Sequence, residues 1–262
     1  MNMLTNFSNY NKVKLAQAIC LVATLWVITF NFNITFLLLG LVVSWLAYCF
    51  GLSISLHKCS SHRTFEPKNK VIKYFLLWCG NIVTMGTSLE FAAGHRTHHK
   101  HSDTSEDPYN LDGGLWHRIK LFFYWFPTRK INPLIIRDLL RDKDQQFFNR
   151  NYWKILLPYP LILLAIDPIL FGYFYAMPVV YVLLGMGYIT VIAHLPSLQK
   201  IGATPFNTND MSWNSRVVGW ILAGEGYHNT HHAHPGSYTY ELSPGDIDVS
   251  ARIIKRLRKV PD

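Results

Sequence analysis

The sequence predicts an all-α integral membrane protein in which four transmembrane helices form two hairpins beneath a cytoplasmic helical cap. Two observations predict this class. Half of the 262 residues are hydrophobic and only 16% are charged, and the apolar residues gather in uncharged runs long enough to cross a bilayer as helices. The alternative is a soluble all-helical protein with buried core helices, which runs of this length disfavour. We therefore treat residues 1–262 as a single membrane domain.

The predicted spans are residues 15–32, 34–56, 152–166 and 168–193. The second is the clearest, because its 23 residues carry no charge. The third is short for a span. It needs Tyr152 and Trp153 as an interfacial aromatic belt, and the Lys154 side chain must reach toward the headgroups.

Lysine and arginine predict the orientation. The short connections inside each predicted hairpin contain neither residue, whereas residues 58–73, 96–154 and 198–259 are rich in both. Positively charged loops stay cytoplasmic, so we expect the cap (57–151 and 194–262) and both termini on the cytoplasmic side of a multi-pass protein. The net charge of +9 then lies on one face, where it favours anionic lipid headgroups and an acidic protein partner. We expect no nucleic acid partner.

Two further apolar stretches are predicted to lie at the membrane without crossing it. Residues 74–89 are short and interrupted by glycine and asparagine, and a crossing there would separate the histidine clusters; we expect a re-entrant or interfacial helix. Residues 115–126 are basic on one face and aromatic on the other, which is typical of a helix on the membrane surface. The polar N-terminus predicts no cleavable signal peptide.

Histidine is the residue type that predicts chemistry. The spacing His-x-x-His-His occurs twice, at His95, His98 and His99 and again at His228, His231 and His232. On a helix these residues project from about the same face, and converging imidazoles make a site for zinc, iron or copper. The four cysteines form no C-x-x-C pair and predict packing roles.

Three more histidines follow predicted spans. His57 and His62 come directly after the second span, and His194 follows the last one. Because the clusters together hold too many ligands for one ion, we expect two metals. Residues five apart lie roughly 140° apart on a regular helix, so His57 and His62 either serve different ions or lie on a distorted helix.

These motifs resemble those of the membrane fatty-acid desaturases, in particular the acyl-CoA Δ9 (stearoyl-CoA) desaturase-like branch. The segment "HKCSSH" resembles the first family box, and "HRTHH", followed by "HSDTSEDPYN", resembles the second. The segment "GEGYHNTHH" resembles the third, and His194 resembles the isolated ninth histidine. The resemblance covers about residues 15 to 255, and the boxes with their spacing are specific together.

The chain departs from the family pattern at three positions. Thr190 stands where the family often has an asparagine that holds the second metal through a water. Phe91 and Gly94 stand where tryptophan and aspartate are common before the second box. Since those two positions lie near the substrate path in the family, the identity of the substrate stays open.

The resemblance implies an O2-dependent acyl desaturase with two non-haem irons. Its implied metal ligands are His57, His62, His95, His98, His99, His194, His228, His231 and His232. Thr190 is a candidate for a water-mediated metal contact, and Asp103, Asp107 and Glu225 are candidates for orienting the ligand imidazoles. His101, His117 and His234 fall outside the boxes.

The implied partners are a fatty acyl substrate, on coenzyme A, acyl carrier protein or lipid, and an acidic electron donor. The donor must be a separate protein, because the chain has no haem-binding or iron–sulfur motif of its own. Ferredoxin and cytochrome b5 are examples of such a donor. Two alternatives stay open at this point. One is a hydroxylase or acetylenase on the same scaffold, and the other is a non-redox membrane zinc protein.

Overall fold

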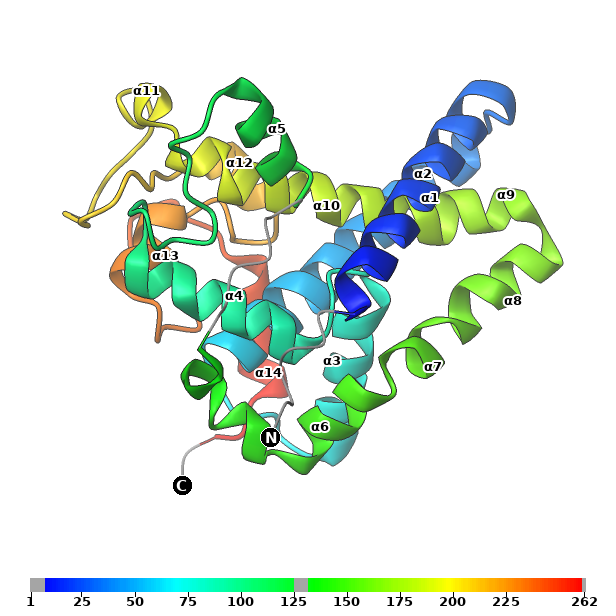
Figure 1. The fold of residues 1–262 in the computed structure, drawn as a ribbon, viewed down its shortest axis with the longest axis horizontal. Coiled ribbons are helices and arrows are strands. Elements are labelled where there is room, and N and C mark those ends of the chain that lie inside the picture. Colours follow the sequence, from blue (N-terminus) through cyan, green and yellow to red (C-terminus); the bar gives the residue numbers. More distant parts are fainter. Residues whose placement is uncertain (1–7, 125–131, 261–262) are drawn as a thin grey trace.

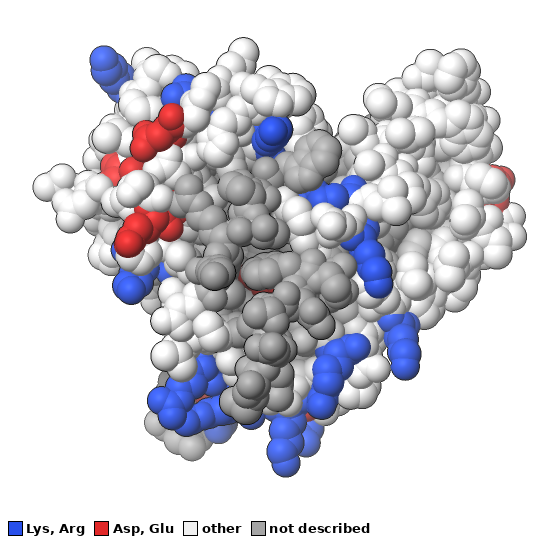
Figure 2. All heavy atoms as spheres, in the orientation of Figure 1, with Lys and Arg blue, Asp and Glu red and all other residues white. Residues whose placement is uncertain are grey.

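The computed structural model describes residues 8–124 and 132–260, and within them the regular elements are helices, with no strand. Figure 1 shows long helices at one end of the molecule and the shorter cap helices at the other. On the face shown in Figure 2, the surface over α2, α8 and α9 is almost free of Lys and Arg, which gather over the opposite end. The molecule therefore has one end that is almost free of Lys and Arg and another end that is rich in them.

Three helices among the described residues are long and apolar enough to cross a membrane: Tyr10–Phe30, Ile34–Ser61 and Pro168–His194. They correspond to the predicted spans 15–32, 34–56 and 168–193. The first is α1 (Ser8–Phe30). The second consists of α2 (Ile34–Leu46) and the π-helix η1 (Ala47–Ser61). The third runs through α9 (Pro168–Phe171), η4 (Gly172–Ala176), α10 (Met177–Thr190) and η5 (Ile192–His194), and it packs against both of the others.

The predicted span 152–166 is shorter than a bilayer requires. It consists of α7 (Tyr152–Leu156) and α8 (Pro158–Ile166), which meet at a proline. Fifteen residues at 1.5 Å per residue reach about 22 Å, against about 30 Å for the hydrocarbon core. The segment is still strongly apolar on its outside, where Leu161, Ile162 and Ile166 are each more than half exposed.

The stretch predicted to lie at the membrane without crossing, 74–89, falls in a helical hairpin. α3 (Lys70–Ile82) packs along η1, and α4 (Ser88–His101) returns beside it. The turn between them has left-handed backbone at Thr84 (φ 58°) and Gly86 (φ 87°). Gln17 of α1 fixes this turn, since its side-chain N–H donates to the Thr84 carbonyl at 2.8 Å. The turn is thereby held against the first span.

The remaining elements form the cap. The predicted surface helix 115–126 is α5 (Leu115–Phe122), which exposes Leu115 and Trp116; residues 125 and 126 lie outside the described residues. The other cap elements are η2 (Pro133–Ile136), η3 (Leu139–Arg141), α6 (Lys143–Arg150), α11 (Pro196–Gln199), α12 (Arg216–Ile221), α13 (His228–Ala233) and α14 (Val249–Leu257).

A fully buried ion pair joins the second span to the last helix. Lys58 Nζ lies 2.7 Å from Asp248 Oδ2, and both side chains are 0% exposed. The ammonium also donates to Ser250 Oγ at 2.6 Å and stands 4.1 Å from the centre of the Tyr240 ring. Asp248 in turn caps α14 by accepting from the backbone N–H of Ala251. The pair therefore fixes α14 to the end of η1.

We expect Asp248→Asn to destabilise the fold by about 3–5 kcal/mol, because it leaves a buried ammonium without its counter-charge. The measurement is thermal unfolding in detergent, followed by size-exclusion chromatography. Arg252→Ala, which breaks an exposed pair with Glu241, is the matched control and should have almost no effect. Equal losses in the two variants would contradict the assignment.

Candidate metal centre

Nine histidines from four separate segments converge in two groups. His57, His62, His95, His99 and His231 form a five-histidine group, and His98, His194, His228 and His232 form a four-histidine group. Within each group the candidate ligand atoms all lie within 4.8 Å of one another. All nine predicted ligand residues are thus brought together, in two clusters as expected for two metals.

The π-helix explains how His57 and His62 enter the same group. The His62 backbone N–H donates to the His57 carbonyl at 3.0 Å, which is the i→i+5 pattern of a π-turn. In a helix wound this way, residues five apart lie close to one face instead of roughly 140° apart. The helix is therefore distorted, and the two histidines do not divide between the groups.

Each His-x-x-His-His motif supplies both groups. On α4, His95 and His99 are one helical turn apart and join the five-histidine group, while His98 joins the other. On α13 the division is reversed, because His228 and His232 belong to the four-histidine group and His231 to the five-histidine group. The two short helices therefore bridge the two groups.

The ring nitrogens that face each other are the Nε2 atoms. In the five-histidine group, the distance is 2.7 Å from His62 to His95 and 2.8 Å from His231 to His99. In the four-histidine group, it is 2.9 Å from His194 to His228. A cation bound at about 2.1 Å, with ligands at right angles, would set neighbouring nitrogens about 3 Å apart. Lone pairs at these distances repel unless a proton or a metal ion lies between them, and the number and spacing of the nitrogens fit two transition-metal ions.

The three predicted carboxylates each contact the opposite nitrogen, Nδ1, of a histidine. The distances are 2.7 Å for Glu225 to His57, 2.8 Å for Asp107 to His98 and 2.9 Å for Asp103 to His194. A carboxylate in this place keeps the proton on Nδ1 and leaves the Nε2 lone pair free for a metal.

Two further contacts of this kind were missed by the sequence analysis. Asp210 Oδ2 lies 2.7 Å from His232 Nδ1, and the Tyr240 hydroxyl lies 2.9 Å from His231 Nδ1. Neither residue stands at a motif spacing from a histidine box. Asp210 comes from the loop before α12, and its other oxygen accepts from the backbone N–H of Ser212.

Burial favours the neutral form of several of these imidazoles. It lowers the pKa of His62, His95 and His99 well below the usual 6.5, and neighbouring histidines lower it further. Burial lowers the pKa of His232 to about 4, although its hydrogen bond with Asp210 opposes the change. Burial alone would raise the pKa of Asp103, but its hydrogen bond with His194 brings that pKa below the usual value. These shifts favour neutral imidazole at the four histidines named and an anionic carboxylate at Asp103.

The three histidines outside the boxes have other partners. His101 pairs with the exposed Glu106 at 2.7 Å, and His117 Nε2 lies 2.9 Å from the Asn110 carbonyl. The His234 ring packs edge-on against Phe206. None of these three belongs to either group.

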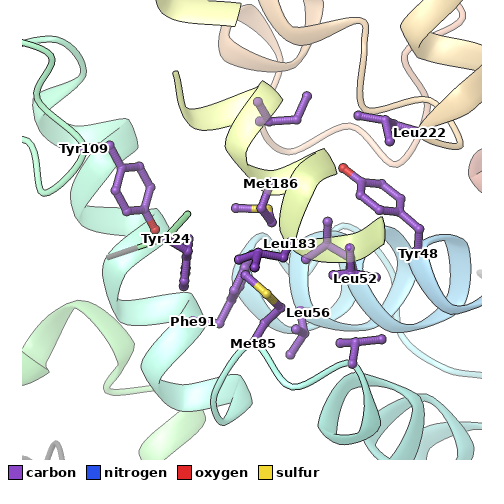
Figure 3. Packing of buried hydrophobic residues seen from close by; sticks show 13 residues of the cluster. Tyr48, Leu52, Leu56, Met85, Phe91, Tyr109, Tyr124, Leu183, Met186 and Leu222 are labelled. Atoms are coloured by element: carbon purple, nitrogen blue, oxygen red, sulfur yellow. The ribbon is translucent and has the colours of Figure 1, made fainter. Parts of the chain in front are cut away.

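A small cavity of about 20 Å³ lies against the histidines. Its lining includes His95, His98 and His228 together with Leu52, Phe91, Met186, Tyr48, Glu225 and Thr190. Thr190 is buried and donates to the Met186 carbonyl at 2.8 Å. Figure 3 shows that Met186, Leu183, Leu52, Leu56 and Phe91 continue this lining into the apolar core. The metal-binding nitrogens thus adjoin an apolar interior of flexible side chains.

Comparison with known proteins identifies the family. A family model for fatty acid desaturases matches residues 19–246. The chain belongs to the fatty acid desaturase family. It is 28% identical over 232 residues to the sn-1 stearoyl-lipid 9-desaturase of Anabaena variabilis, covering 87% of this chain and 82% of that protein.

Two other relatives show the range of the family. The chain is 31% identical to the sn-1 stearoyl-lipid 9-desaturase of Synechocystis sp. (79% of this chain, 64% of that protein). It is 29% identical to the icosanoyl-CoA 5-desaturase of Limnanthes douglasii (87% and 63%). The chain therefore spans slightly less than two thirds of these two relatives. The predicted resemblance to Δ9 desaturase-like proteins is confirmed.

We expect Asp210→Asn to weaken metal binding at the four-histidine group by about 10- to 100-fold, because the imidazole of His232 loses its anionic partner. Metal content per chain, measured against increasing chelator, should fall in two separated steps instead of together. Glu106→Gln, which removes a carboxylate from a histidine outside the groups, is the control. A chelator profile identical to wild type would show that Asp210 does not support the site.

Proposed function

We propose that the protein is an O2-dependent desaturase that introduces a double bond into a fatty acyl chain with a non-haem di-iron centre. One observation carries this proposal: nine Nε2 atoms point into two adjoining groups, at the ends of apolar helices, in a chain of the fatty acid desaturase family. Imidazole also suits zinc and copper, and the resemblance to the fatty acid desaturases supports iron.

The two histidine groups would each hold one iron. Bound iron supplies the activation of O2 that removal of hydrogen from an unactivated alkyl chain requires, which no side-chain acid or base provides. The carboxylates of Asp103 and Asp107 accept hydrogen bonds from ring Nδ1 atoms, and that of Glu225 lies against Nδ1 of His57, so that all three orient the rings. Thr190 adjoins the four-histidine group and offers an oxygen that accepts a hydrogen bond from a water. Phe91, which stacks on His95 at 5.8 Å, and its apolar neighbours orient the alkyl chain.

We also propose the topology of two hairpins with a cytoplasmic cap in one domain. In this arrangement α7 and α8 form the fourth crossing, with Tyr152 and Trp153 at its cap-side end. The distribution of Lys and Arg in Figure 2 supports it. Residues 1–7 and 261–262, which carry the two ends of the chain, lie outside the described residues, and their cytoplasmic location is part of the proposal.

The electrons would come from a separate acidic carrier, such as ferredoxin or cytochrome b5, that docks on the cap. The net charge of +9 and the gathering of basic side chains at the charged end (Figure 2) support this partner. Complementary charge raises the rate of encounter more than the affinity.

We expect alanine at any one of the nine histidines to abolish product formation, because loss of one ligand unbalances a shared centre. The measurement is double-bond analysis of lipids from a desaturase-deficient host, combined with iron content of the purified protein. His101→Ala and His234→Ala are the controls and should retain product. Hydroxylated or acetylenic products would instead identify another oxidase of the same scaffold, and a zinc-only, inactive protein would contradict the proposal.

We expect the turnover rate, measured at a limiting concentration of the electron donor, to fall as the salt concentration rises. Dissolved ions screen the attraction between the two proteins, with a screening length of about 8 Å at physiological ionic strength. Charge reversal at Lys255 and Arg256, two exposed residues of α14, should lower the same rate without changing iron content. A rate indifferent to both changes would exclude this docking surface.

A further inference from the structure

Residues 215–226 project from the cap, and the two ends of this segment lie side by side. This segment, which we call the α12 hairpin, contains α12, and its base is closed by the Ser215 N–H donating to the Gly226 carbonyl at 2.8 Å. Glycine is required at the base, because a Cβ on Gly226 would lie 2.2 Å from the backbone nitrogen of Gly219. The segment is therefore a narrow closed hairpin.

Two membrane-spanning helices hold the end of this hairpin. The indole N–H of Trp45, on α2, donates to the Trp220 carbonyl at 3.3 Å. The hydroxyl of Tyr181, on α10, donates to the Ile221 carbonyl at 2.6 Å. The end of α12 therefore has the same depth as these two side chains.

The depth of Trp45 and Tyr181 in the bilayer follows from their distance to the distal ends of the spans, which are the ends farthest from the cap. Trp45 is 11 residues beyond Ile34, where α2 begins, and this is about 17 Å along a helix. Tyr181 is 13 residues beyond Pro168, or about 20 Å. The hydrocarbon core is about 30 Å thick, so both residues lie about 10 Å inside its cap-side edge. Tilted spans would place them deeper, and helical side chains lean toward the N-terminal end, which here is the distal end.

The backbone of α12 is satisfied as an apolar environment requires. The last carbonyls of a helix have no partner within the helix, and in hydrocarbon each unpaired one is costly. The carbonyls of Trp220 and Ile221 are paired with the side chains of the two spans. The Val218 carbonyl accepts a hydrogen bond from the Leu222 N–H, and the Gly219 carbonyl accepts one from the Gly224 N–H, both at 2.7 Å. No carbonyl from Val218 to Ile221 depends on water.

The outer face of α12 is apolar as well. Val217, Trp220 and Ile221 are 70%, 56% and 49% exposed. Arg216 begins the helix, about 8 Å from Ile221 along it, and its guanidinium pairs with Asp246 at 3.2 Å on the headgroup side. This pattern is typical of a segment inserted 5–10 Å into a leaflet.

Immediately behind this face lies the lining of the active site. Leu222, which follows the exposed Ile221, is 4% exposed and packs in the same core cluster as Tyr48 and Met186, as Figure 3 shows. Both of those residues line the cavity beside the histidines, and the hydroxyl of Tyr48 is buried there without a hydrogen-bond partner. Val218 and Tyr181 cover the cluster from outside. One layer of side chains thus separates the bilayer from the cavity.

We propose that the α12 hairpin is embedded in the cap-side leaflet and forms a lateral wall through which the acyl chain of a bilayer lipid enters the active site. This rests on the desaturase function proposed above and specifies the carrier of its substrate. A chain that enters sideways stays in hydrocarbon throughout, so its headgroup remains at the interface beside Arg216. The preferred substrate is then an acyl group esterified in a membrane lipid, not one on a water-soluble carrier.

The depth of the hairpin is tested in proteoliposomes. In a background with Cys20, Cys49, Cys59 and Cys79 replaced, a nitroxide label is attached at Val217→Cys or Trp220→Cys, with Arg256→Cys on α14 as the exposed control. Labels at 217 and 220 should collide more with oxygen, which partitions into lipid, than with a water-soluble nickel chelate, and the control should show the reverse. Equal collision ratios at all three positions would overturn the embedding.

The entry route is tested with two substrates that carry the same acyl chain. Iron-loaded protein with an electron donor is given stearoyl-phosphatidylglycerol in the bilayer or stearoyl-CoA in solution. We expect the lipid-borne chain to react at least about tenfold faster, and Val218→Trp, which thickens the wall, to slow that reaction at unchanged iron content. Reaction of the coenzyme A ester alone would overturn lateral entry and keep the desaturase function. No product from either substrate would contradict the desaturase function itself.

Discussion

The structure depends on bringing nine imidazoles together with their Nε2 atoms facing one another. Such an arrangement is unfavourable by itself, because the Nε2 atoms approach to about hydrogen-bond distance, as between His62 and His95, in a place from which water is excluded. It persists because the opposite side of several rings is fixed by carboxylates and because helices fix the backbone that carries them. Much of the cap therefore serves to position histidine side chains so that their Nε2 atoms face one another.

The supports of the two groups differ in kind. Among the described residues, the four-histidine group has three carboxylates at ring nitrogens, those of Asp103, Asp107 and Asp210, whereas the five-histidine group has Glu225 alone. The group with fewer imidazoles therefore has more negative charge around it. With this arrangement, extra carboxylates around one metal site can compensate for its smaller number of histidine ligands.

The sequence alone was enough for the helical class, the three long spans and the membership of both His-x-x-His-His motifs in one centre. Hydrophobic run length and helical spacing are local properties, and they predict local structure well. The role of the short segment 152–166 is harder to predict, because its composition is as apolar as that of a span while its length is too short to cross the bilayer. The π-turn between His57 and His62 was foreseen only as one of two options, since hydrogen-bond register is not visible in residue types. Asp210 and Tyr240 were missed because tertiary packing, not spacing, brings them to the histidines.

The ion pair between Lys58 and Asp248 has a consequence for how the protein is made. The two residues are 190 positions apart in the chain, and ribosomes add roughly 5–20 residues per second. For about 10–40 s after Lys58 is added, its native partner Asp248 has not yet been made, and the first two spans enter the bilayer before the buried pair can form. Completion of the fold is thus a late event, set by the arrival of the last helix. A chain that stops before residue 248 lacks the carboxylate that pairs with Lys58, so it cannot complete the buried ion pair.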